Sequence, residues 1–284
     1  MLLETHGNGI PMALINARIS DRSARNWKRA ARSARHLLGC FSFIHCQDAR
    51  TTQHLHDLGI TAAFTGQNLK SAAGPLPFDK TEAALFRNTI SRRPIWLASS
   101  THPGEEEIVL TAHRALLKDY PDLLLLLVPR HPERAGDIAH MISAQGLTHS
   151  RRSAGEKPST DTQVYLADTL GETGLWYKLS PITCLCGSFT PVGGHNPYEP
   201  AYAGSAVLHG PQYANFAQVY ADFDSTGGAV EVADADALAQ TVDRLLGDRT
   251  ALKQMRNQAS SYAVAQSEML EALSGTLCTA LNLR

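Results

Sequence analysis

The stretch TPVGGHNPYEPA, residues 190–201, gathers turn-forming and polar residues just before a helix-like segment. Gly193 and Gly194 would let the backbone approach a ligand closely. Asn196 suits a helix N-cap and Pro197 the first helical position, so unpaired N–H groups would face a phosphate there. Glu199 is placed to close a capping box or to accept hydrogen bonds from ribose hydroxyls. The pattern predicts a nucleotide site, with a tight turn before a self-capped helix as the alternative.

Arg130 follows the apolar run Leu123–Val128, which reads as a buried strand. A guanidinium group at the end of that strand can add a charge-assisted hydrogen bond to a phosphate. Polar loops also follow the candidate strands 94–99, 163–167 and 182–186. In open parallel sheets ligands gather at the carboxyl ends of the strands, so these loops are expected to form one site.

Short β-prone runs alternate with segments of helical period along the whole chain. The predicted strands are 12–16, 41–46, 62–65, 94–99, 123–128, 163–167, 182–186, 206–208 and 229–232. The predicted helices are 22–38, 49–58, 104–118, 133–145, 172–179, 197–203, 215–222 and 235–246. This alternation indicates an α/β protein with doubly wound parallel sheets.

The irregular segment TGQNLKSAAGPLPFD interrupts this alternation and is typical of an interdomain linker. We therefore expect a partial N-terminal Rossmann-like domain over 1–70, a linker over 71–92 and a nucleotide-binding Rossmann-like domain with C-terminal helices over 93–284. Three candidate strands before the linker are few for an open parallel sheet, which indicates that the first domain is incomplete.

The bulk composition excludes several classes of protein. A formal net charge of −1 argues against a nucleic-acid-binding protein, although a local patch can still attract an anion. The longest aliphatic run is far too short to span a bilayer, and no signal-peptide pattern follows Met1. The five cysteines have neither zinc-ribbon nor redox-motif spacing, so reduced thiols, mostly buried, are expected.

Taken together, the motifs resemble those of the bacterial 3-deoxy-D-manno-octulosonic acid (Kdo) transferases of lipid A assembly. The matching segments cover essentially the whole chain in the family's order. They are INARISDRSAR (15–25), TGQNLK (65–70), STHPGEEE (100–107), LLLVPRHPER (125–134), ADTLGETGLWY (167–177), GSFTPVGGHNPYEPA (187–201) and GPQYANF (210–216).

The resemblance implies a two-domain GT-B fold with CMP-Kdo as the donor and an anionic lipid A precursor as the acceptor, without a cofactor or metal. It implies work at the cytoplasmic face of the inner membrane. Donor-binding roles carry over to three elements, and weaker roles to three further positions. The three elements are Pro129 and Arg130; Leu170, Gly171 and Glu172; and Asn196, Pro197, Tyr198 and Glu199. The further positions are Ser188 and the pair Ser100 and Thr101, with local capping as the alternative for each, and His195, which either orients the glycine loop or contacts the sugar.

The sequence also departs from the family pattern. The family's membrane-associating segment, its glycine-rich region with the carboxylate base, and a glutamate-bearing motif have no counterpart in 1–284. General base catalysis is typically worth about 10²- to 10⁴-fold, so we expect this chain alone to be a poor or inactive transferase. Cys186 stands where the family usually has glycine, and Gln212 where it usually has histidine.

A stripe of basic residues marks the segment 22–38. Ala24, Trp27, Ala31, Ala34 and Leu38 fall on one helical face, whereas Arg22, Arg25, Arg29, Arg32 and His36 form another stripe. A solvated basic face is the ordinary interpretation of such a stripe. In the resembling family the face can instead draw the protein to an anionic glycolipid or membrane surface.

Two rival functions differ in class from the transferase. One is a folded remnant that binds a nucleotide and catalyses nothing. The other is a GT-B enzyme that uses a uridine nucleotide sugar, because the glycine loop and the ribose-facing glutamate recur in that fold. DTLGE together with GGHNPYEP favours the Kdo transferase family over the second rival.

Overall fold

The computed structural model describes residues 1–66, 74–91 and 93–282, and of residues 269–272 only the backbone. The chain divides into two compact units: unit 1 comprises Met1–Ala73 and Ala265–Arg284, and unit 2 comprises Gly74–Val264. Both contain parallel sheets, which confirms the predicted α/β class. Within the described residues, no helix combines the length and apolar character needed to cross a membrane.

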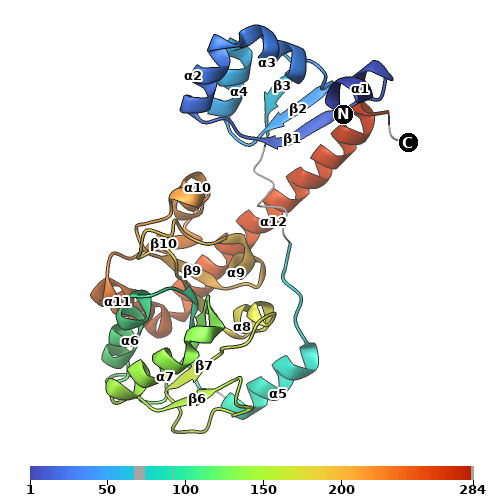
Figure 1. The fold of residues 1–284 in the computed structure, drawn as a ribbon. Helices are drawn as coiled ribbons and strands as arrows, with labels where there is room; N and C mark the ends of the chain where they lie inside the picture. Colours follow the sequence, from blue (N-terminus) through green and yellow to red (C-terminus); the bar gives the residue numbers. More distant parts are fainter. Residues whose placement is uncertain (67–73, 92, 283–284) are drawn as a thin grey trace. The chain divides into compact units, whose positions relative to one another are not determined.

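Unit 1 has a three-stranded parallel sheet in the order β1-β2-β3, drawn in blue in Figure 1. Its core includes the stripe predicted for 22–38: Ala24 and Ala34 are buried, and Trp27 is packed beside them. The predicted single helix is broken at Ala30, whose φ of −119° and ψ of 38° leave the helical region. The elements are α1 (Leu2–Gly7), β1 (Ala13–Ala17), α2 (Asp21–Arg29), α3 (Ala31–Leu38), β2 (Phe43–Cys46), α4 (Ala49–Asp57) and β3 (Ala63–Thr65).

Unit 2 is built on a seven-stranded parallel sheet in the order β10-β9-β8-β4-β5-β7-β6. Its strands are β4 (Ile95–Thr101), β5 (Leu124–Pro129), β6 (His149–Arg151), β7 (Val164–Leu166), β8 (Ile182–Leu185), β9 (Ala206–His209) and β10 (Ala229–Glu231). Its helices are α5 (Lys80–Ile90), α6 (Glu105–Leu116), η2 (Pro132–Arg134), α7 (Ala135–Ala144), α8 (Thr173–Leu179), α9 (Tyr198–Tyr202), η3 (Ala214–Phe216), α10 (Ala217–Ser225) and α11 (Ala235–Gly247), followed by α12 (Arg249–Ala280), which is divided between the units.

The strand order of unit 2 reverses between β4 and β8. From β4 the chain forms β5, then the edge strand β6, then β7 between β5 and β6, and it returns to place β8 on the other side of β4. A reversal of this kind opens a crevice at the carboxyl ends of the two neighbouring strands. The loops that follow β4 and β8 are therefore the ones positioned to bind a ligand.

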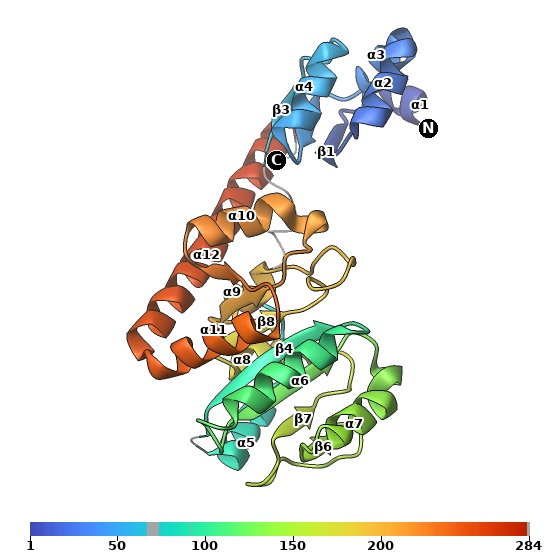
Figure 2. The ribbon, with the colours of Figure 1, turned by 90° about the vertical axis from the view of Figure 1, so that its left-hand side faces the viewer.

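Helices cover both faces of this sheet, so its inner strands are buried on both sides. Along β5, Leu125 and Leu127 pack in the cluster with α6, α7 and α11, and Leu124 and Leu126 pack in the cluster with α5, α8 and α10. The rotated view shows α6 and α11 side by side (Figure 2). Full burial of a leucine contributes roughly 1.5–3 kcal/mol, so this leucine run anchors the unit.

The structure divides the chain differently from the predicted domains. Residues 80–90 of the predicted linker form α5, whose Ala83, Phe86 and Ile90 are buried in unit 2. A Cβ atom at Gly174 of α8 would lie 2.4 Å from the carbonyl oxygen of Pro77, so this glycine lets the preceding segment lie against α8. Some predicted positions lie outside the described residues. They are 71–73 and 92 of the linker and 67–70 of the TGQNLK motif.

His113 of α6 is a buried histidine held in its neutral form. Trp96 Nε1–H donates to its Nδ1 at 3.1 Å, and its Nε2 lies 2.9 Å from the carbonyl oxygen of Gln163, so Nε2 carries the proton. Burial lowers the pKa of His113 to about 3. Below the unfolded pKa of about 6.5 the unfolded chain therefore binds a proton that the folded unit does not.

We expect acid to destabilise unit 2 as the pH falls from about 6.5 toward 3, by up to about 1.4 kcal/mol per pH unit from His113. Urea unfolding at pH 7 and pH 5 measures this effect. Replacing Trp27 by Phe confines the tryptophan fluorescence to Trp96 and Trp176, both in unit 2. His113→Gln should flatten the pH dependence, and an unchanged slope in that variant would contradict the assignment.

Candidate functional site

The loops after β4, β5 and β8 meet at one edge of the unit 2 sheet. The backbone N–H of Arg130 donates to the carbonyl oxygen of Thr101 at 3.0 Å, which ties the end of β5 to the end of β4. Ser100 has a φ of 59° at an irregularity in the β4–β5 pairing. A left-handed serine is uncommon and costs free energy, and such residues cluster at functional sites.

Arg130 is an exposed cation with no ion-pair partner among the residues that the structure describes. Its charge still acts on its surroundings: it adds to the effect of burial, which lowers the pKa of His102 and His195, and it opposes the effect of burial, which raises the pKa of Glu199. An unpaired arginine within reach of these groups can accept an anion without first breaking a salt bridge. The prediction for Arg130 is thus compatible with its place in the structure.

His102 and His195 form a hydrogen-bonded pair of rings at the β4–β8 reversal. Their Nε2 atoms lie 3.0 Å apart, and the rings are 13° from parallel with centroids 5.2 Å apart. Rings stacked face to face could not bring two nitrogens so close, so the nitrogens point at each other and one of them carries the hydrogen. Burial lowers the pKa of both rings, that of His195 to about 4, which keeps the pair neutral near pH 7.

Gly193 and Gly194 have a packing role in addition to the ligand role that the sequence predicts. Their φ angles of 97° and 81° lie in the left-handed region. A Cβ atom at Gly193 would lie 2.5 Å from Asn215 Nδ2, and one at Gly194 would lie 3.1 Å from Tyr213 Cβ. These glycines therefore allow η3 and its flanking residues to pack against the loop.

The helix after the glycine loop begins at Tyr198, one residue later than predicted. Asn196, predicted as the N-cap, therefore precedes the cap by one residue, and its side-chain oxygen accepts a hydrogen bond from the Tyr198 N–H at 3.2 Å. Pro197 occupies the cap position with helical dihedral angles. Burial raises the pKa of Glu199, against the opposing effects of Asn196 and Arg130. Glu199 is thus a partly buried carboxyl group suited to hydrogen-bond donors such as hydroxyls.

Several predicted contact residues belong to the packing. The buried Ser188 hydroxyl donates to the Leu185 carbonyl oxygen and accepts from the Gly210 N–H, both at 2.7 Å. Tyr198 is 3% exposed and packs against Phe223 and Tyr262. Local structure, the alternative considered for Ser188, is therefore the observed role. Pro129 and Thr101 are buried at the strand ends, and the Thr101 hydroxyl has no hydrogen-bond partner among the described residues.

Glu172 is held by an arginine that the sequence analysis did not single out. Arg152 binds its carboxylate through two nitrogens at 3.0 and 2.6 Å and also contacts Glu82 of α5 at 2.7 Å. The hydrogen bond from Arg152 is the main cause that lowers the pKa of Glu172. The neighbouring Leu170 is 77% exposed and Gly171 has a φ of 82°. The carboxylate therefore fixes this loop, and Leu170 is the side chain that the loop presents to solvent.

Glu105 is the second residue that sequence reasoning missed, although it lies inside a quoted motif. Its side chain is 0% exposed, and its carboxylate accepts four backbone N–H bonds. Oε2 binds the N–H of His102 at 2.9 Å and of Gly187 at 2.7 Å, and Oε1 binds that of Ser188 at 3.0 Å and of Phe189 at 2.9 Å. No local sequence signal marks this role, because three of the donors are more than eighty positions away.

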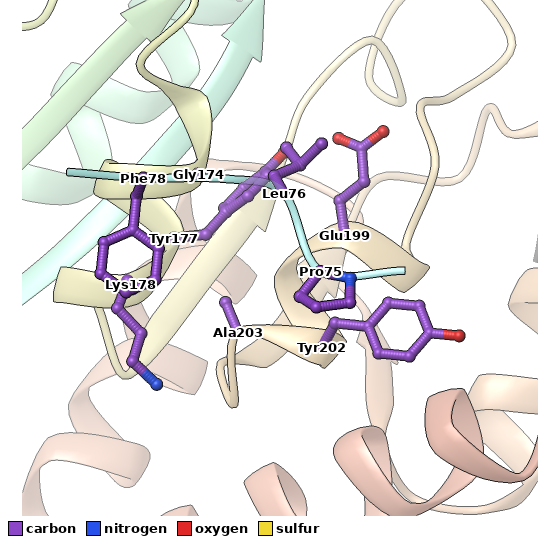
Figure 3. Close-up of a pocket in the computed structure, with 9 residues that line it drawn as sticks. All are labelled: Pro75, Leu76, Phe78, Gly174, Tyr177, Lys178, Glu199, Tyr202 and Ala203. Atoms are coloured by element: carbon purple, nitrogen blue, oxygen red, sulfur yellow. The ribbon is translucent and has the colours of Figure 1, made fainter. Parts of the chain in front are cut away.

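Two hollows adjoin the site. The first, of about 60 Å³, has Glu199, Tyr177 and Gly174 in its lining and is closed by Pro75 and Leu76 (Figure 3). The second, of about 420 Å³, lies over the glycine loop and the segment that precedes α10. It is lined by Pro191, Gly193, Pro211, Gln212, Tyr213, Ala214 and Ala217. Both hollows lie wholly within unit 2.

The predicted basic patch lies in unit 1. Arg22, Arg25, Arg29 and Arg32 are all exposed on α2 and α3, and none has an ion-pair partner in the described part of the chain. By contrast, Lys28 on α2 pairs with Asp57 at 2.9 Å. The four arginines are therefore available to an external anion.

Comparison with known proteins gives consistent results. Residues 1–73 match the family model described as 3-deoxy-D-manno-octulosonic-acid transferase. The chain is 37% identical over 273 residues to the enzyme of that name from Haemophilus influenzae, covering 93% of this chain and 63% of that protein. The transferase from Bordetella pertussis is 31% identical over 94% of this chain and 63% of its own length. The chain thus spans less than two thirds of these relatives.

Solved structures that resemble this chain agree with the sequence comparisons. The C-terminal CMP-Kdo binding domain of WaaA from Acinetobacter baumannii is 34% identical, with a TM-score of 0.60 over 64% of this chain and 95% of that one. HepE from Anabaena, solved with UDP, has a TM-score of 0.55 over 98% of this chain and 75% of its own at 12% identity, so it informs on the fold alone. These neighbours confirm the predicted GT-B class.

The shared hydrogen of the histidine pair is open to a direct measurement. We expect His195 to stay neutral down to about pH 4, with one protonated Nε2 between the two rings. Long-range ¹H–¹⁵N NMR spectra across a pH titration measure both features. His102→Asn should raise the pKa of His195 because it admits water to the ring. His131→Asn, which alters a ring that only lies edge-on to His102, should preserve the signal. Two rings that titrate independently near pH 6.5 would contradict the geometry.

Proposed function

Since the chain belongs to the 3-deoxy-D-manno-octulosonic acid transferase family, we propose that it serves the transfer of Kdo from CMP-Kdo to an anionic lipid A precursor. Unit 2 would hold the donor nucleotide. This role is supported by the 34% identity between 64% of this chain and a domain described as CMP-Kdo binding. We propose the reaction without a resident cofactor or metal, at the cytoplasmic face of the inner membrane.

The observation that carries the proposal is the unpaired Arg130 beside a neutral histidine pair at the β4–β8 reversal. The site therefore presents a positive charge that no ion pair among the described residues occupies, which suits a phosphate. The helix dipole adds little, because α9 is only five residues long. Arg130 would bind the phosphate, and Glu199 would accept hydrogen bonds from the ribose hydroxyls.

The proposed chemistry is an inverting displacement. An acceptor hydroxyl attacks the anomeric carbon of Kdo, and the bond from that carbon to the phosphate oxygen breaks. The bonding electrons leave with CMP, whose phosphate gains a negative charge that Arg130 would stabilise. The hydroxyl proton passes to a carboxylate base, to which we assign no residue of 1–284. Arg130 thus favours the transition state more than the bound donor, which is what accelerates transfer.

CMP binding tests the assignment of the donor site. By isothermal titration, Arg130→Ala and Glu199→Ala should each weaken CMP binding by about tenfold or more, the loss of one charge-assisted or buried hydrogen bond. Arg114→Ala, which removes another exposed arginine of unit 2, is the matched control and should change nothing. Cytidine separates the roles: Glu199→Ala should weaken its binding, and Arg130→Ala should not.

Three results would count against this function. Equal CMP affinity in wild type, Arg130→Ala and Glu199→Ala would remove the site. Tighter binding of UDP than of CMP by the wild-type chain would favour the rival uridine-nucleotide enzyme. CMP binding without any transfer to a lipid A precursor would favour the nucleotide-binding remnant.

The exposed arginines of α2 and α3 form a basic surface that suits the proposed anionic acceptor. We propose that Arg22, Arg25, Arg29 and Arg32 attract the phosphorylated glycolipid or the anionic lipids around it. A basic side chain near such a surface contributes about 1 kcal/mol, so four together can hold the protein at a membrane in a salt-dependent way.

Vesicle binding tests this surface. Reversing two charges, with Arg25→Glu and Arg29→Glu together, should lower binding to vesicles that contain phosphatidylglycerol by at least about tenfold at low salt. The control reverses two exposed arginines of unit 2, Arg114→Glu and Arg249→Glu, with the same change in net charge. Sedimentation with vesicles measures the bound fraction, and equal loss in both double variants would reduce the effect to net charge alone.

A further inference from the structure

We propose that Glu105 is a positioning residue of the donor site, whose carboxylate occupies a cradle of backbone N–H groups as an internal anion. The cradle consists of the N–H groups of His102, Gly187, Ser188 and Phe189. The inference rests on the proposed function for its link to CMP. The occupancy of the cradle itself follows from the contacts.

The four hydrogen bonds explain why an anion is needed there. Both oxygens of Glu105 accept two bonds each, at 2.7–3.0 Å, and the side chain is fully buried. No cation forms an ion pair with Glu105 in the described residues, whereas the adjacent Glu106 is bound by Arg134 at 2.7 and 3.1 Å. The N–H dipoles are therefore the direct partners of the Glu105 charge, and its place in the first turn of α6 adds to their effect.

A phosphate bound at such a reversal commonly uses the backbone N–H groups of the loop that follows the strand. In this chain the carboxylate of Glu105 already takes the N–H groups of residues 187–189. A ligand phosphate must then depend on side chains, and Arg130 is the unpaired cation beside the reversal. Glu105 thus decides which groups remain for the ligand.

The cradle also sets the positions of the histidine pair. His102 donates its backbone N–H to Glu105, so the carboxylate fixes the backbone that carries one ring of the pair. Gly187 has a φ of 70°, and a Cβ atom there would lie 2.7 Å from His195 Cδ2. The second ring therefore packs directly on the cradle. A shift of either loop by even one ångström would break the 3.0 Å contact between the rings.

The experiment empties the cradle and then fills it with a small carboxylate. Glu105→Ala leaves four buried N–H groups without an acceptor, so CMP binding should weaken by at least about tenfold and the melting temperature should fall. Formate should restore both in this variant, and chloride at equal ionic strength should restore neither. Glu105→Gln keeps the volume but turns an NH₂ group toward N–H donors, so it should lose affinity without responding to formate.

Two controls separate positioning from stability. Glu107→Ala removes an exposed neighbouring carboxylate and should leave CMP affinity within about twofold, with no response to formate. His113→Gln, which alters a buried group outside the cradle, should lower the melting temperature while leaving CMP affinity unchanged. The contrast between this variant and Glu105→Ala distinguishes a positioned site from a merely destabilised unit.

Each outcome decides the proposal. Wild-type CMP affinity in Glu105→Gln would overturn it, including in the case where Glu105→Ala does not fold. Restoration of Glu105→Ala by chloride as fully as by formate would also overturn it, because the cradle would then have no need of a carboxylate. If the wild-type chain binds no CMP, the proposed function fails, and the formate response of the melting temperature still tests the cradle.

Discussion

The parallel pairing of β4 with β8 is the contact on which the rest of unit 2 depends. Leu97, Ala98 and Ser99 pair with Thr183, Cys184 and Leu185, residues that lie more than eighty positions later in the chain. The pairing brings the loops after the two strands together, and the Glu105 carboxylate then joins them through four N–H bonds. Without that pairing, neither the N–H cradle nor the histidine pair could form.

Charge in unit 2 is divided between groups that hold the structure and a group that is left available. Two arginines form ion pairs that join separate elements. Arg134 binds Glu106, and Arg152 binds both Glu172 and Glu82. Such partly buried pairs are expensive to break, because each partner would be left as an uncompensated charge. Arg130 forms no such ion pair among the described residues. Among the described residues, the fold thus holds these charges in ion pairs and leaves Arg130 able to meet an anion.

The pattern of apolar residues was sufficient to predict the strands. Every predicted strand is confirmed within two residues, because strands buried on both faces require continuous apolar runs such as Leu123–Val128. β6 was missed, since His149–Arg151 is a polar edge strand without that pattern. Likewise α5 was assigned to a linker. Its Phe86 and Ile90 are core residues only because the fold places them in one buried cluster, where Phe86 packs on Tyr165 and Trp176.

The sequence by itself determined the α/β layering, the family resemblance and the loops that meet at the site, because these depend on local patterns and motif order. Only the tertiary structure decided what each polar side chain in those loops does. Ser188 and Tyr198 looked like ligand contacts and are packed inside, whereas Glu105 looked like one acid among three and joins two loops. The physical reason is that a hydrogen bond depends on distance in space, and the partners of these groups come from strands that the sheet alone brings together.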